Sequence, residues 1–131
     1  MRVLDATFLI DYGNEVDAAA EYLFDHADHE FLVPAPVYTE YLLGSVHSNA
    51  PTDIEGARGE LVWSEVFAID EETAVTAARV ADETGPEGPN LTAIDALVAG
   101  VSREVGAPLV SDDSDLTHAE TKDVVDVDEY R

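Results

Sequence analysis

Short apolar runs alternate along the chain with longer segments in which apolar residues recur every three or four positions. The short runs predict strands and the periodic segments predict amphipathic helices. The predicted strands cover residues 2–5, 31–33, 66–69, 109–110 and 124–127. The predicted helices cover residues 14–27, 36–46, 52–63, 71–84 and 91–105, with a helical turn at 7–11. Because strands alternate with helices, we expect a three-layer α/β/α domain around a central parallel sheet of four to five strands.

Proline, glycine and acidic residues mark where the predicted helices begin and end. Pro36 suits the first turn of a helix, Asp70 is placed to cap the helix after it, and Gly106 ends a helix. The segment 85–89 is rich in Gly and Pro and predicts a loop. The helix over 14–27 is expected to bury a face made of Val16, Ala19, Ala20 and Leu23.

The length of the chain, 131 residues, fits a single domain (residues 1–131) with its own hydrophobic core. The absence of Cys excludes disulfides and thiolate metal sites. No apolar run approaches the length of a transmembrane helix, and the first residues show no signal-peptide pattern. We therefore expect a cytoplasmic protein without a membrane partner.

The charge balance is strongly acidic, with 29 Asp and Glu against six Lys and Arg and a formal net charge of −23. Such a charge repels nucleic acid at ordinary ionic strength, and the six basic residues are scattered, so they form no basic patch. The chain has 18 Ala and 16 Val against four Ile and one Lys, a profile that resembles proteins of salt-accumulating halophiles. At about 1 M salt the Debye length is only about 3 Å, so the self-repulsion would be screened.

Four acidic residues stand out because each lies beside or within an apolar segment, where an unpaired carboxylate is unfavourable: Asp5, Glu40, Asp95 and Asp113. Asp5 ends the first predicted strand and Asp113 follows the fourth, and open parallel sheets bind ligands at the carboxyl ends of their strands. Glu40 and Asp95 lie on predicted helices that must pack against the same edge. Because gathered carboxylates raise each other's pKa unless a cation neutralises them, this quartet predicts bound hard metal ions and phosphate chemistry.

Each of these acids also has a purely structural alternative. Asp5 could cap the turn at residues 7–11, and Glu40 could lie on a solvated helix face. Thr92 and Asp95 have the spacing of a capping box, so Asp95 could be the reciprocal cap of Thr92. The spacing alone leaves both interpretations open for each residue.

Three carboxylates within four residues follow the fourth predicted strand, at Asp112, Asp113 and Asp115. A solvated turn would explain them in so acidic a chain. They are also dense enough to hold Mg²⁺ or Mn²⁺, which prefer oxygen ligands.

Read in order, four segments resemble the motifs of PIN-domain ribonucleases, specifically the VapC-type toxins of toxin–antitoxin pairs. The resemblance covers nearly the whole chain, and the four motifs together are far more specific than any one of them. The segments are Val3-Leu-Asp5-Ala-Thr7-Phe-Leu-Ile-Asp11, Thr39-Glu40-Tyr-Leu-Leu-Gly44, Ile94-Asp95-Ala-Leu-Val-Ala-Gly100 and Leu109-Val-Ser111-Asp-Asp113-Ser-Asp115-Leu116.

This resemblance implies a metal-dependent endoribonuclease that is the toxin of a type II toxin–antitoxin system. It implies Mg²⁺ or Mn²⁺ as cofactor, with RNA as substrate, a cognate antitoxin as partner, and a homodimer. The catalytic carboxylates would be Asp5, Glu40, Asp95 and Asp113. The metal ligands would be Asp5, Asp95, Asp113 and Asp115, with Thr7 and Ser111 orienting a ligand carboxylate or a water.

Two other classes of function remain compatible with the sequence. The first is a catalytically silent PIN module that acts only by binding a partner protein. The second is a receiver-type phosphoacceptor domain, which is also α/β with an acidic metal pocket. A receiver normally needs a Lys after a late strand, where this chain has Ser111, Asp112 and Asp113.

Overall fold

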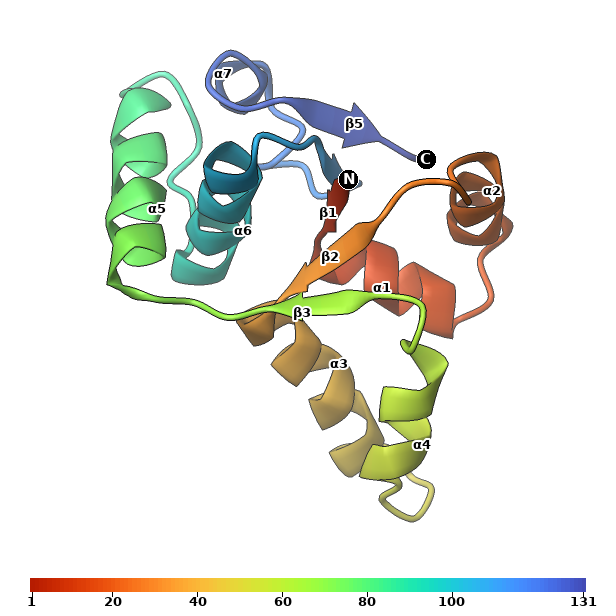
Figure 1. The fold of residues 1–131 in the computed structure, drawn as a ribbon. Helices are drawn as coiled ribbons and strands as arrows, with labels where there is room; N and C mark the ends of the chain where they lie inside the picture. Colours follow the sequence, from red (N-terminus) through yellow and green to blue (C-terminus); the bar gives the residue numbers. More distant parts are fainter.

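A five-stranded, fully parallel sheet runs through the computed structural model, which describes residues 1–131 (Figure 1). The order of the strands is β3-β2-β1-β4-β5. This arrangement confirms the predicted α/β class and the upper end of the predicted strand number. The strands are β1 (Arg2–Leu4), β2 (Phe31–Pro34), β3 (Glu65–Phe67), β4 (Leu109–Ser111) and β5 (Val127–Glu129).

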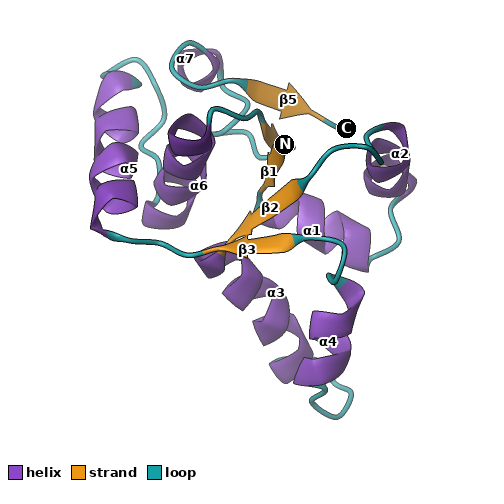
Figure 2. Cartoon of the chain, in the orientation of Figure 1, coloured by secondary structure: helices purple, strands orange, loops and turns teal.

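Seven helices connect the strands and cover both faces of the sheet (Figures 1 and 2). Helices α1 to α4 lie on one side, and α5 and α6 pack side by side on the other. No helix is both long enough and apolar enough to cross a membrane. The helices are α1 (Ala6–Gly13), α2 (Asp17–Asp25), α3 (Ala35–Val46), α4 (Ile54–Glu60), α5 (Glu71–Glu83), α6 (Ala93–Val105) and α7 (Ala119–Lys122).

The three central strands form the middle of the hydrophobic core. Val3 and Leu4 of β1, Val33 of β2, and Leu109 and Val110 of β4 are fully buried. Because helices cover both faces, these strands are apolar without alternation, as is usual in parallel sheets. The edge strands are more polar, and Val66 of β3 is largely exposed.

Helix α6 shows how the sequence sets a helix that carries a candidate site residue. The Thr92 hydroxyl caps its first turn, and Gly106 ends it with a left-handed φ of 66°. Gly100 lets α6 approach α5 closely, since a Cβ there would lie 2.9 Å from the backbone nitrogen of Ala77. Val98 and Val101 are buried on the inner face. These contacts fix the position of the first turn of α6, where Asp95 lies.

Two helical segments differ from the prediction. The turn expected at residues 7–11 is the complete helix α1, and α2 is shorter than the expected helix over 14–27. Glu15 separates the two helices with a φ of 60°, a conformation that no α-helix accommodates. The buried face of α2 contains Tyr22, whereas Ala20 is exposed, so the expected inner face was partly wrong.

The two edge strands are also displaced from their predicted positions. β3 begins at Glu65 and ends before the predicted limit, because the chain then extends toward the cap of α5 at Asp70. β5 starts at Val127 instead of residue 124. The backbone N–H groups of Val124 and Val125 donate to the Thr121 carbonyl and continue the unpredicted turn of α7, so they are unavailable to the sheet.

The connections out of the central strands place a topological switch point between β1 and β4. The chain leaves β1 toward β2 on one side, whereas β4 lies on the other side of β1 and is reached from β3 through α5 and α6. In open α/β sheets such a reversal of strand order leaves a binding crevice at the carboxyl ends of the two strands. Asp5 directly follows β1, and Asp113 lies two residues beyond β4.

Candidate metal centre

Asp5 directly follows β1 and is almost completely buried, with 3% of its surface exposed. Its Oδ1 accepts from the Phe8 N–H at 3.0 Å, which makes Asp5 the N-cap of α1. The Thr7 hydroxyl lies 2.8 and 2.9 Å from the two carboxylate oxygens. Burial raises the pKa of Asp5 to about 6, and the hydrogen bonds from Ser111, Phe8 and Thr7 only partly offset this rise. Asp5 therefore fills the capping role that was predicted as an alternative. It does so in a buried position, which capping alone does not require.

Ser111 connects Asp5 to the segment that follows β4. Its hydroxyl donates to Oδ2 of Asp5 at 2.5 Å and accepts from the Asp113 N–H at 2.9 Å. The Thr7 hydroxyl accepts from the Asp112 N–H at 3.0 Å, a second link between the same segments. Both hydroxyl residues that the sequence indicated thus hold the ends of β1 and β4 together around the Asp5 carboxylate.

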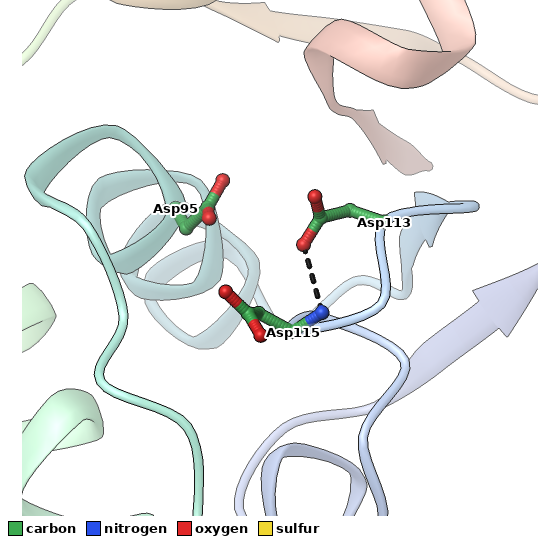
Figure 3. A group of neighbouring side chains, drawn as sticks. All are labelled: Asp95, Asp113 and Asp115. Carbon is green, nitrogen blue, oxygen red and sulfur yellow. Dashed lines mark hydrogen bonds between the residues drawn. The ribbon is translucent and has the colours of Figure 1, made fainter.

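Asp95, Asp113 and Asp115 form the densest group of carboxylates at this edge (Figure 3). Each offers one oxygen, and these three oxygens lie within 4.8 Å of one another. Asp113 is held by its own turn, because its Oδ2 accepts from the N–H groups of Asp115 and Leu116 at 3.0 and 3.1 Å. Figure 3 shows the Asp95 carboxylate facing this turn from α6.

Asp95 performs a structural task with its backbone and leaves its carboxylate in the cluster. Its N–H donates to the Thr92 hydroxyl at 3.2 Å, completing the cap of α6. Partial burial raises the pKa of the Asp95 carboxyl, and the charges of Asp113, Asp115 and Glu40 raise it further. The mutual repulsion that the sequence predicted for gathered carboxylates is therefore present here.

Glu40 stands apart from the three-carboxylate cluster. It is exposed on α3 and contributes no oxygen to the group formed by Asp95, Asp113 and Asp115. Its charge still reaches Asp95 and raises the pKa of that carboxyl. Glu40 also lines a groove of about 490 Å³ between α1, α3 and α4. The structure thus leaves Glu40 outside the three-carboxylate cluster, but close enough for its charge to act on Asp95.

The donor set fits a hard divalent cation. It consists of carboxylate oxygens alone, the ligands that Mg²⁺ and Mn²⁺ prefer over nitrogen or sulfur. The three oxygens lie within 4.8 Å of one another, close enough for Asp95, Asp113 and Asp115 to hold one cation together. A cation would also remove the repulsion that raises the pKa of Asp95. Asp5 already accepts three donors and has room for about one further ligand, since an ionised carboxylate has about four acceptor positions.

Two residues near this edge, Tyr130 and Arg131, were not singled out from the sequence. Tyr130 donates its hydroxyl to Oδ2 of Asp11 at 2.6 Å, and Nη1 of Arg131 lies 2.9 Å from the same oxygen. Their position follows from the register of β5, in which Glu129 pairs with Ser111. Placing the last strand at residues 124–127 hid this relation. A strand three residues further along the chain would have pointed to it.

The fold and the site together define a parallel α/β domain with a cluster of carboxylates at its topological switch point. The PIN domain family model matches residues 2–122, and the chain belongs to that family. This match favours the PIN interpretation over the receiver-type alternative. No curated protein matches the chain in sequence.

Solved structures share the fold over essentially the whole chain. A toxin–antitoxin complex from Klebsiella pneumoniae contains a chain with 14% identity and a TM-score of 0.80, and the alignment covers 100% of this chain and 98% of that one. A DNA-bound VapBC from Salmonella typhimurium gives 17% identity and a TM-score of 0.80, with coverages of 99% and 98%. FitAcB from Neisseria gonorrhoeae gives 16% and 0.77, with coverages of 97% and 96%. At these identities the similarity establishes the shared fold.

Proposed function

We propose that this protein is a metal-dependent endoribonuclease and the toxin of a type II toxin–antitoxin pair. The observation that carries the proposal is the meeting of Asp95, Asp113 and Asp115 beside the buried Asp5 in a PIN domain. The fold alone could serve many functions, but an all-carboxylate centre at the switch point suits cation-assisted phosphodiester chemistry.

In this centre the carboxylates would bind the cation, and the neighbouring hydroxyl groups would hold one of those carboxylates in place. Asp95, Asp113 and Asp115 would supply one oxygen each to Mg²⁺ or Mn²⁺, and Asp5 would supply a further oxygen from below. Glu40 would act from outside the three-carboxylate cluster, either on the cation or on a water that the cation holds. Thr7 and Ser111 would keep the Asp5 carboxylate in one orientation through their observed hydrogen bonds.

A bound divalent cation supplies a water of lowered pKa and neutralises charge that develops on the phosphate. The chain contributes the geometry, because Asp113 is fixed by its turn and Asp95 by the cap of α6. No His or Lys lies in the cluster to act as a general base. The carboxylates themselves would therefore orient the attacking water.

The expected partners rest on the structural neighbours. The Klebsiella chain comes from a toxin–antitoxin complex, and the Salmonella chain comes from a DNA-bound VapBC. We propose that this chain likewise binds a cognate antitoxin and forms a homodimer in the cytoplasm. We further propose that the net charge of −23 is an adaptation to a salt-rich cell interior. Activity should therefore be assayed in concentrated KCl, which screens this charge.

The substitution Asp95→Asn tests the centre directly. It removes one ligand charge while keeping the backbone N–H that caps α6, so the fold should persist. RNA cleavage in Mn²⁺ is expected to fall by about 100-fold or more, and calorimetry should show weaker Mn²⁺ binding. Asp82→Asn, on the exposed side of α5, makes the same change in net charge and is expected to behave as wild type.

The result separates the remaining alternatives. Wild-type cleavage by Asp95→Asn would rule out this centre. If the wild-type protein binds Mn²⁺ and cleaves no RNA, the catalytically silent PIN module becomes the better description.

A further inference from the structure

The six basic residues of this acidic chain differ in where their charges lie. Arg131 forms an ion pair with Asp11 of α1, the helix that Asp5 begins. No other ion pair involves α1 or the segment 111–115. Four of the other five basic residues form ion pairs elsewhere: Arg2 with Asp128, Arg58 with Glu55, Arg103 with Glu83, and Lys122 with Glu129. Arg79, on α5, forms no ion pair.

The sheet places Arg131 at the same edge as the acidic centre. β5 is parallel to β4, and Glu129 pairs with Ser111, so the next two residues leave the sheet at the level of Asp112 and Asp113. The Tyr130 ring packs edge-on against Phe8, with centroids 4.8 Å apart. This contact and the hydrogen bond to Asp11 hold the segment against α1.

The guanidinium contacts one acid near Thr7 and feels the charge of a second. Its Nη1 contacts Asp11, one turn after Thr7 on α1, and the charge of Asp112 also acts on it. The Asp112 N–H in turn donates to the Thr7 hydroxyl, which holds Asp5. Arg131 is therefore a neighbour of the residues that support the centre, although it contacts none of the carboxylates of the cluster.

Most of the hydrogen-bonding capacity of Arg131 is unused. The side chain is 50% exposed, and its recorded hydrogen bond runs from Nη1 to Asp11. A guanidinium has five N–H donors arranged to match a phosphate, so several remain available to a ligand.

We propose that Arg131 binds a backbone phosphate of the RNA next to the one that is cleaved. The inference rests on the proposed ribonuclease function and adds a positioning residue to it. RNA must approach an edge that carries at least six carboxylates, counting Asp11 and Asp112. A fixed cation beside Asp11 offsets part of that repulsion and gives the strand a defined register. Asp11 and Tyr130 hold the guanidinium in place while leaving its outer donors free.

The test compares Arg131→Gln with Arg79→Gln, which removes an equal charge from α5. Initial rates on a short labelled RNA in Mn²⁺ would give kcat and KM across a series of KCl concentrations. For Arg131→Gln we expect KM to rise about tenfold with kcat within about twofold, the effect of one lost charge-assisted contact. The dependence of log KM on log salt should become shallower by about 0.7, the value for one phosphate contact in a single strand.

If Arg131 only stabilised the fold, its substitution would change the stability of the protein and not its response to salt. It would lower the melting temperature and leave the salt dependence of KM unchanged, and that outcome would overturn the proposal. Arg131→Lys keeps the charge and loses the planar fork, so its KM should lie between those of wild type and the Gln variant. If Arg131→Gln unfolds, a wild-type KM in the Lys variant would count against phosphate recognition by the guanidinium. Absence of cleavage in the wild-type protein would instead contradict the ribonuclease function itself.

Discussion

Asp5 and Asp70 occupy the same local position in two different parts of the molecule. Each follows an apolar segment and begins a helix, α1 or α5, by accepting the N–H of the residue three positions on at 3.0 Å. Each also accepts from a hydroxyl in the first turn, Thr7 for Asp5 and Thr73 for Asp70. Their pKa values nevertheless shift in opposite directions.

The surroundings explain the difference. Asp70 is exposed, and the hydrogen bonds from the Thr73 backbone and hydroxyl hold the pKa of its carboxyl below the usual value. Asp5 is buried between β1 and β4, with Asp113 nearby, and desolvation raises its pKa despite similar hydrogen bonds. The same cap therefore stabilises the fold at Asp70, whereas at Asp5 the burial of the ionised carboxylate costs folding free energy. Buried carboxyl groups with a raised pKa cluster at functional sites.

The largest expected difference between the two caps is in activity. Asp5→Asn and Asp70→Asn each keep a good N-cap acceptor, so both variants should fold. Asp5→Asn is expected to reduce RNA cleavage in Mn²⁺ by more than the roughly 100-fold that loss of a supporting residue can cost. Asp70→Asn should cleave at the wild-type rate. Equal activity of the two variants would show that Asp5 is only a cap.

A smaller effect is expected from the hydroxyl that holds Asp5. Ser111→Ala removes the 2.5 Å hydrogen bond to Asp5 and the acceptor for the Asp113 N–H. We expect cleavage and Mn²⁺ affinity to fall by roughly 10–100-fold together, as for other residues that orient metal ligands. Thr73→Ala makes the matched change beside Asp70 and should leave both quantities unchanged. An active Ser111→Ala protein with normal Mn²⁺ binding would contradict this role.

The smallest expected effect is on the stability of the metal-free protein. The folded pKa of Asp5 is about 6, above the usual 3.8, so the folded state holds more protons between these values. The free energy of unfolding should therefore fall as pH rises from about 4 to about 6, and Asp5→Asn should flatten that fall. At pH 7 the Asn variant should be more stable by about 1–3 kcal/mol, as measured by urea unfolding.

Asp70 should show the opposite sign. Its lowered pKa contributes stability above 3.8 that is lost as the pH falls through and below that value, and Asp70→Asn should remove it. If both Asn substitutions destabilise the protein at pH 7, the burial of Asp5 carries no energetic cost and the comparison fails.

Much of the fold could be predicted from local patterns. The pattern predicted β1, β2 and β4 because central parallel strands are continuous apolar runs. It predicted α5 and α6 because long helices show apolar residues every three or four positions. The edges were less predictable. β5 has few apolar residues, and the turn of α7 takes up Val124 and Val125, so the pattern alone placed that strand too early.

The sequence by itself determined the fold class, the family resemblance and the acids that end the central strands, because these depend on residue type and spacing. Only the tertiary structure decided which acids meet. It separated Glu40 from the cluster of Asp95, Asp113 and Asp115, and it brought Arg131 beside α1. The physical reason is that desolvation and Coulomb interactions depend on distance in space, which strand order and register set and local sequence does not.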